Sequence, residues 1–112
     1  METTKLTAKK CVPCEGGIPA LTQSEVNELL KSVHNWEAIN NYSEITRHFH
    51  FKNFHKTMEF VNAVANMAHE ENHHPDLEVG YNYCRIRYST HAIGGLSEND
   101  FICAAKVDHL AL

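Results

Sequence analysis

The sequence has no long apolar run, no secretory leader pattern and no excess of basic charge. No stretch approaches the ~20 apolar residues that a membrane-spanning helix needs, and the opening METTKLTAKK is polar throughout. The chain has 10 Lys and Arg against 14 Asp and Glu, a net charge of -4, whereas binding to nucleic acid needs a basic face. We therefore expect a cytoplasmic protein that binds neither membranes nor nucleic acid directly, with its four cysteines reduced.

The chain is instead rich in histidine and sized for one domain. Its 112 residues, 43% of them hydrophobic, suffice for one core. Residues 1–20 are rich in Lys, Thr, Gly and Pro and have no apolar periodicity. They are expected to form a flexible N-terminal arm, followed by the folded domain over residues 21–112. Three of the nine histidines fall in one short segment, HEENHHPD, from His69 to Asp76.

Hydrophobic spacing predicts three helices and four strands. Helices are expected over residues 21–34, from a cap at Asn53 to about Asn72, and from Ser97 onward. The middle helix has a predicted core stripe formed by Phe54, Met58, Val61, Val64, Ala65 and Ala68. Strands are expected over residues 36–40, 43–51, 77–81 and 83–89. The order α-β-β-α-β-β-α predicts an α+β fold, a four-stranded antiparallel sheet with helices packed on one face.

The first five letters of HEENHHPD match the H-E-x-x-H signature of zinc proteases. On a helix this spacing places two imidazoles on one side, with the glutamate as general base. The predicted helix places His69 and His73 in its last turns, one turn apart on one face. However, Pro75 stops the helix soon after His73, and the glycine and third histidine of the metzincin pattern are replaced by Asp76 and Val79. The zinc hydrolase therefore stays an alternative, which stoichiometric zinc would favour.

The cysteines suggest a second metal or redox motif. Cys11-Val-Pro-Cys14 has the spacing of half a zinc site or of a redox pair, but there is no second C-x-x-C. We interpret this pair as reduced thiols on the arm, and Cys84 and Cys103 as small core residues.

A wider pattern accounts for the histidines better. It reads His69-x3-His73-His74-Pro75-x5-Tyr81-x9-His91-x8-Asp100, and it is accompanied by the phrases NWEAIN, RHFHFKNF, YNYCRIRYSTH and GGLSENDF. With these residues the chain resembles the pterin-4a-carbinolamine dehydratase family over roughly residues 21–109. Many members have Glu where this chain has His69, and the Cys11/Cys14 arm lies outside the shared region.

The resemblance implies an enzyme that removes water from 4a-hydroxytetrahydrobiopterin to give the quinonoid dihydropterin. It needs neither metal nor organic cofactor, because the ring nitrogen's lone pair expels the hydroxyl. Histidine suits the two proton transfers, since its ordinary pKa of about 6.5 is close to cellular pH. The resemblance assigns catalysis to His73, His91 and His74, and substrate binding to His74, Pro75, His69, Tyr81 and Asp100. Which of His73 and His91 is the acid stays open.

Each site residue also has an ordinary structural explanation. Tyr81 and Trp36 could be core residues. Asp100 could do no more than cap the last helix at Ser97; in the functional interpretation it holds His91.

The resemblance further implies a pterin partner, a functional link to phenylalanine hydroxylase through cofactor recycling, and a homodimer or homotetramer. The competing function is a binding protein without turnover that stabilises a transcription factor or acts elsewhere in pterin metabolism.

Overall fold

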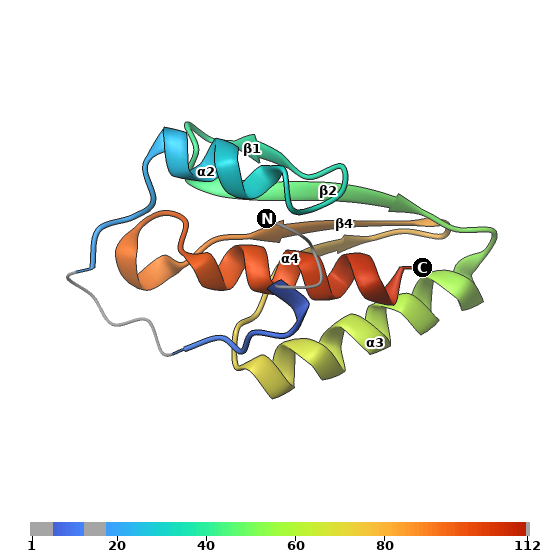
Figure 1. Cartoon of the computed structure of the whole chain (residues 1–112). Coiled ribbons are helices and arrows are strands. Elements are labelled where there is room, and N and C mark those ends of the chain that lie inside the picture. The colour runs from blue at the N-terminus through green and yellow to red at the C-terminus, as the bar shows by residue number, and fades with distance from the viewer. Residues whose placement is uncertain (1–5, 13–17, 112) are drawn as a thin grey trace.

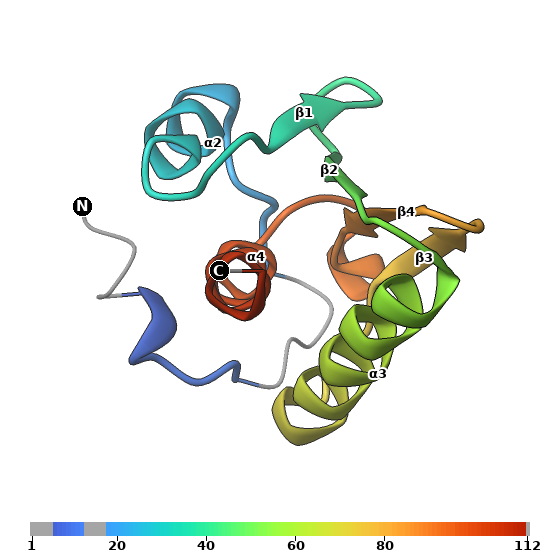
Figure 2. The same cartoon turned by 90° about the vertical axis from the view of Figure 1, so that its right-hand side faces the viewer.

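The expected element order is confirmed in the computed structural model, which describes residues 6–12 and 18–111. The elements are α2 (Gln23–Leu30), β1 (Glu37–Ile39), β2 (Glu44–His50), α3 (Phe54–Glu71), β3 (Asp76–Val79), β4 (Tyr83–Tyr88), the 3-10 turn η1 (His91–Ile93) and α4 (Glu98–Leu110). The strands form one antiparallel sheet in the order β1-β2-β4-β3. The helices α2, α3 and α4 lie on one side of it (Figures 1 and 2), as the sequence predicts.

The alternation of side chains along the strands decides which sheet face the helices cover. In β2, Ile45 and Phe49 are buried while His48 and His50 are exposed, which is the predicted period of two. Phe49 pairs across the sheet with Cys84 of β4, whose side chain is also buried. The core therefore lies between the sheet and the helices.

The start of α3 is confirmed, but its predicted core stripe is partly wrong. Asn53 caps the helix as expected, because its side chain accepts a hydrogen bond from the Lys56 amide at 2.9 Å. Phe54, however, is 51% exposed. The buried face consists of Thr57, Phe60, Val64, Met67 and Ala68. The helix has apolar residues on two adjacent stripes, and its packing beside β4 and α4 buries only one of them.

The C-terminal end of α4 is joined to the sheet by a buried carboxylate. Asp108 accepts hydrogen bonds from Trp36 Nε1 at 2.7 Å and from the His34 amide at 2.8 Å. It also forms an ion pair with Arg47 at 2.6 Å. Three segments far apart in sequence thus meet at one oxygen pair, which fixes the position of α4 against β2.

Residues 6–12 pass across α4 on the side away from the sheet (Figure 2). Leu6 is fully buried in the core, and the Lys106 ammonium donates to the Thr7 carbonyl at 3.1 Å. This part of the predicted arm therefore has fixed contacts, although its flexibility and the domain boundary at residue 21 stay predictions. Cys14 lies outside the described residues.

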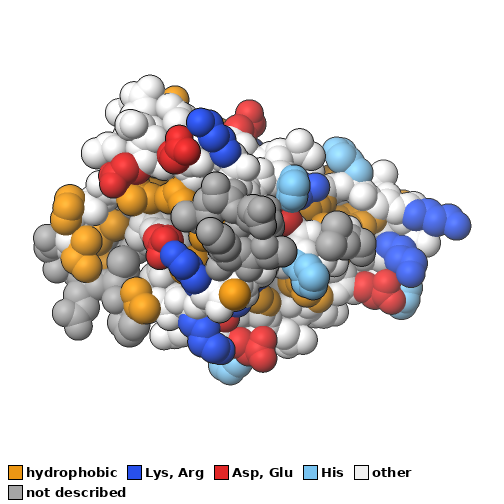
Figure 3. All heavy atoms as spheres, viewed as in Figure 1, with side chains coloured by type: hydrophobic (Ala, Val, Ile, Leu, Met, Phe, Trp, Pro, Cys, Tyr) orange, Lys and Arg blue, Asp and Glu red, His pale blue; other side chains and the backbone are white. Residues whose placement is uncertain are grey.

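The surface seen in Figure 3 mixes acidic and basic side chains, with hydrophobic side chains between them. Across the described part of the chain, no helix has the length and apolarity required to cross a bilayer.

Candidate functional site

The C-terminal end of α3 places the histidine pair of HEENHHPD. Asn72 adopts the left-handed conformation, with φ 52 and ψ 40. The Asn72 amide donates to the His69 carbonyl and the His73 amide to the Ala68 carbonyl, each at 3.2 Å. This is a Schellman ending, in which a left-handed residue satisfies the last free carbonyls. The prediction that His73 lies in the last helical turn is therefore wrong, because the helix closes at Asn72 before Pro75 can end it.

A buried carboxylate holds His73. Asp100, in the first turn of α4, is 0% exposed, and its Oδ1 lies 2.6 Å from His73 Nε2. The other oxygen accepts from Thr90 Oγ1 at 2.8 Å and from the Ser97 amide at 3.0 Å. Asp100 therefore caps α4 as expected, but the expectation that it holds His91 is wrong, since its histidine partner is His73.

The surroundings of His73 define its orientation and tautomer. Its ring stacks on Tyr88, with centroids 5.7 Å apart and planes 6° from parallel, and its side chain is 13% exposed. A carboxylate oxygen accepts hydrogen bonds, so the geometry assigns the donor role to Nε2 and leaves the lone pair of a neutral ring on Nδ1. Burial, together with the nearby Cys103 thiol, raises the pKa of the Tyr88 hydroxyl, so the ring under His73 stays neutral.

Three histidines line one cavity of about 750 Å³, a volume in the range of small-molecule sites. His73, His74 and Pro75 enter it from the segment after α3, and His91 enters it from η1. His74 and His91 are exposed, whereas His73 is mostly covered. The cavity therefore combines one fixed imidazole with two that water or a ligand can reach.

This arrangement differs from that of a zinc protease. His69 lies within α3 and His73 beyond its end, so the helical face that H-E-x-x-H requires is not formed. Among the described residues, no three His, Cys, Asp or Glu side chains are grouped as metal ligands.

Comparison with known proteins agrees with the sequence resemblance. A family model described as pterin 4 alpha carbinolamine dehydratase matches residues 19–110. The chain belongs to this family. A Nitrosomonas eutropha protein named "Putative pterin-4-alpha-carbinolamine dehydratase" is 58% identical over 108 residues, covering 96% of this chain and 94% of the relative. A Legionella pneumophila (strain Corby) protein with the same name is 53% identical over 109 residues, covering 96% of both chains.

Two solved structures place the fold in the same group. A transcriptional coactivator/pterin dehydratase from Brucella melitensis has a TM-score of 0.79 and 33% identity, covering 83% of this chain and 99% of its own. A pterin dehydratase-like protein identified as a RuBisCO assembly factor in the alpha-carboxysome has a TM-score of 0.61 and 26% identity, covering 70% of this chain and 90% of its own. The pterin dehydratase fold is thus found in proteins named for different roles.

Not every residue of the dehydratase pattern lies at the cavity of this chain. His69 is exposed on the last turn of α3 and is not among the lining residues. Tyr81 is 65% exposed, and its carbonyl accepts from Thr57 at the start of α3. The cavity lies at the other end of this helix, because the lining residue Glu71 is 14 residues beyond Thr57, roughly 21 Å at ~1.5 Å per residue. Tyr81 is therefore neither a core residue nor part of this cavity.

One wall of the cavity, formed by the N-terminal segment, was not predicted from the sequence. Cys11, Val12 and Asn99 all line the cavity. Asn99 bonds the Val12 backbone twice, accepting from its amide at 3.1 Å and donating to its carbonyl at 2.7 Å. The N-terminal segment has no hydrophobic periodicity that would predict packing against the fold. Its partner Asn99 is also far away in sequence, so no local motif links the two.

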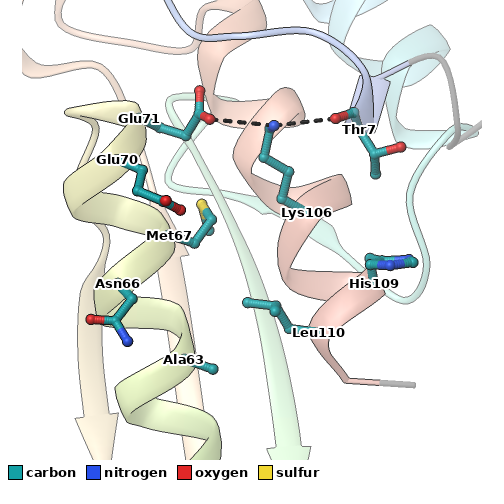
Figure 4. A pocket seen from close by; sticks show the side chains of 9 residues that line it. All are labelled: Thr7, Ala63, Asn66, Met67, Glu70, Glu71, Lys106, His109 and Leu110. Atoms are coloured by element: carbon teal, nitrogen blue, oxygen red, sulfur yellow. Dashed lines mark hydrogen bonds and ion pairs between the residues drawn. The ribbon is translucent and has the colours of Figure 1, made fainter.

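A second cavity, of about 590 Å³, lies between α3 and α4 and shares Glu70 and Glu71 with the first. Figure 4 shows Glu71 and Thr7 on either side of the Lys106 ammonium, which lies 3.3 Å from the Glu71 carboxylate. Burial opposes ionisation of Glu71, but hydrogen bonds from the Cys11 amide and from Lys106 outweigh it, so the pKa of Glu71 is lowered. The ion pair between Glu71 and Lys106 therefore joins the N-terminal segment to α3 and α4.

Proposed function

We propose that this protein dehydrates a 4a-hydroxytetrahydropterin, 4a-hydroxytetrahydrobiopterin or a close analogue, to the quinonoid dihydropterin. The observation that carries the proposal is the convergence of His73, His74 and His91 on one cavity, with His73 bonded to buried Asp100. Membership of the dehydratase family supports the reaction class.

The reaction requires loss of the hydroxyl at C4a and of the proton at N5. His73 acts as the base in this proposal, because Asp100 occupies Nε2 and leaves the Nδ1 lone pair to accept the N5 proton. The buried carboxylate then stabilises the imidazolium that forms, as a carboxylate does behind a catalytic histidine.

His91 acts as the acid in the same scheme. Its exposed ring lines the cavity, so as an imidazolium it can protonate the departing hydroxyl, which leaves as water. The ring nitrogen's lone pair expels the hydroxyl, and the N5–H electron pair remains on the pterin as the N5 proton goes to His73. His74 and Pro75 orient the ring, and no step in this scheme uses a metal or an organic cofactor.

The test of this function is the dehydration of synthetic 4a-hydroxytetrahydropterin, followed by absorbance, with and without a strong chelator. We expect turnover to persist in chelator and to fall roughly 10²–10⁴-fold in His91→Gln, the usual range for losing an acid–base group. His55→Gln is the matched control, because His55 is 79% exposed on α3, away from the cavity. Wild-type protein no faster than buffer would refute the assignment, and turnover abolished by chelator would refute the metal-free scheme.

The biological setting belongs to the same proposal. Regeneration of pterin for an aromatic amino acid hydroxylase, such as phenylalanine hydroxylase, would place the enzyme in the cytoplasm. A homodimer or homotetramer is consistent with β3, an edge strand of the sheet on which all four residues are exposed. Light scattering on the purified protein would measure the mass of the assembly.

A binding role without turnover is the second candidate. It is favoured by the two solved structures, which are named a transcriptional coactivator/pterin dehydratase and a RuBisCO assembly factor. Pterin binding without dehydration would support it.

A further inference from the structure

We propose that Cys11 and Cys103 form a reversible disulfide that fastens the N-terminal segment to α4 at the wall of the histidine cavity. Their sulfur atoms lie 3.4 Å apart, although the residues are separated by 92 positions in sequence. Cys11 also lines the cavity. The proposal concerns thiol chemistry and does not depend on the dehydratase reaction.

Contacts on both sides of Cys11 hold it beside α4. Its own amide donates to Glu71 Oε1 at 2.9 Å, and the next residue, Val12, makes two hydrogen bonds with Asn99. Earlier in the segment, Leu6 is fully buried, and Lys9 forms an ion pair with Glu98 at 3.0 Å. The sulfur–sulfur approach therefore belongs to a segment with several independent anchors.

The two thiols differ in solvent exposure, and this difference determines which of them is oxidised first. Cys11 is half-buried, whereas Cys103 is fully buried. The hydrogen bond with Cys11, followed by burial, raises the pKa of the Cys103 thiol, so Cys103 is the poorer first nucleophile. Cys11 is thus the thiol that meets an oxidant arriving from the cavity.

The oxidant of this proposal is hydrogen peroxide. The Cys11 thiolate attacks one peroxide oxygen, the O–O bond breaks, and Cys11 becomes a sulfenic acid while hydroxide leaves. Cys103 then attacks the Cys11 sulfur, the S–O bond breaks, and the second oxygen leaves as water once the Cys103 proton is transferred. Two thiols lose two electrons in total, and one peroxide becomes two waters. A small dithiol reverses the reaction by exchange.

The disulfide would also affect residues outside the N-terminal segment, namely Tyr88 and His73. Closing the sulfur atoms from 3.4 Å to a bond of ~2.05 Å fixes Cys11 against α4. The Tyr88 hydroxyl lies beside Cys103, and the Tyr88 ring stacks on the imidazole of His73. Oxidation therefore changes the layer directly behind the fixed imidazole and fixes one wall of its cavity.

The experiment treats the Cys14→Ser protein with hydrogen peroxide and digests it with trypsin without reduction. The substitution removes the C-x-x-C competitor and leaves Cys11, Cys84 and Cys103. Cleavage after Lys10, Lys31, Arg87 and Lys106 places Cys11 in peptide 11–31 and Cys103 in peptide 88–106. We expect these peptides to be linked, with one free thiol left at Cys84, whose pKa burial raises to about 11.

Thermal unfolding gives a second readout. Because the disulfide closes most of the chain into a loop, we expect the Tm to rise by roughly 5–15 °C and to return on adding dithiothreitol. The matched control is the Cys11→Ser, Cys14→Ser double variant, which should show neither the linked peptide nor the reversible shift. Recovery of Cys11 as a sulfinic acid or in an intermolecular disulfide would overturn the proposal. A Cys11–Cys14 disulfide as the main product in the wild-type protein would also overturn it.

Discussion

The residue that organises the site is Asp100 rather than any of the histidines. Its two oxygens bond His73, Thr90 and the Ser97 amide, so one buried carboxylate orients the imidazole and begins α4. The sequence predicts the capping role from the Ser97–Asp100 spacing alone. The sequence could not predict which histidine bonds Asp100, because only the complete fold determines whether His73 or His91 comes close to it.

Asp100→Asn tests this role with little change of shape. The amide can donate to His73 Nε2 and thereby move the ring proton to Nδ1, so the base would lose its lone pair. We expect kcat to fall roughly 10²–10⁴-fold, as when a histidine's carboxylate partner is replaced by its amide. The unfolding free energy should fall by only about 1–3 kcal/mol, because the Asn oxygen can still accept from Ser97. A kcat within threefold of wild type would contradict the assignment.

At the scale of elements, the end of α3 decides where the histidines point. Hydrophobic spacing predicted this helix and its Asn53 cap, because both signals are local. Its end near Asn72 was predicted too, but His73 was wrongly placed in the last turn, because the sequence does not show that Asn72 adopts the left-handed conformation that closes the helix before His73. The buried stripe was partly wrong for another reason, because Phe54 and Phe60 are both apolar and only the packing selects Phe60.

Asn72 can be tested with two small residues. Glycine adopts the left-handed conformation without a Cβ clash, whereas alanine does not. We expect Asn72→Ala to be about 1–2 kcal/mol less stable than Asn72→Gly in urea denaturation. Asn72→Ala should also have the lower kcat, because a shifted turn moves His73 away from Asp100. Equal stability of the two variants would show that the turn does not constrain residue 72.

At the scale of the whole molecule, the N-terminal segment is part of the packed structure. Composition predicted an arm over residues 1–20, but Leu6 is buried in the core and Glu71 joins Cys11 to Lys106. No local sequence pattern predicts such contacts, because they join residues that are far apart in sequence. The fold class was predictable because it depends on the order of local patterns.

The lowered pKa of Glu71 gives this contact a pH signature. A carboxylate whose pKa is lowered by folding stabilises the native state fully above the ordinary glutamate value of about 4.3, and the stabilisation is lost as pH falls through the folded value. We expect the unfolding free energy to fall more steeply between about pH 5 and pH 3 in wild type than in Glu71→Gln. Fluorescence of the single tryptophan, Trp36, would report unfolding.

Glu98→Gln is the control for this pH series. Glu98 also joins the segment to a helix, through Lys9, but its carboxylate is 48% exposed, so its ion pair contributes little. Its pH dependence should follow the wild type. A Glu71→Gln curve parallel to wild type would show that the segment is not coupled to the fold through this carboxylate.

In the proposed reaction His73 performs chemistry rather than only binding the pterin. The most direct measurement is the single-turnover dehydration rate of His73→Gln at saturating enzyme, together with the Kd of an unreactive pterin. We expect the saturating rate to fall roughly 10²–10⁴-fold, with a Kd within about threefold of wild type because His74 and Pro75 still line the cavity. An unchanged saturating rate would show that His73 takes no part in the chemistry, whatever the effect on Kd.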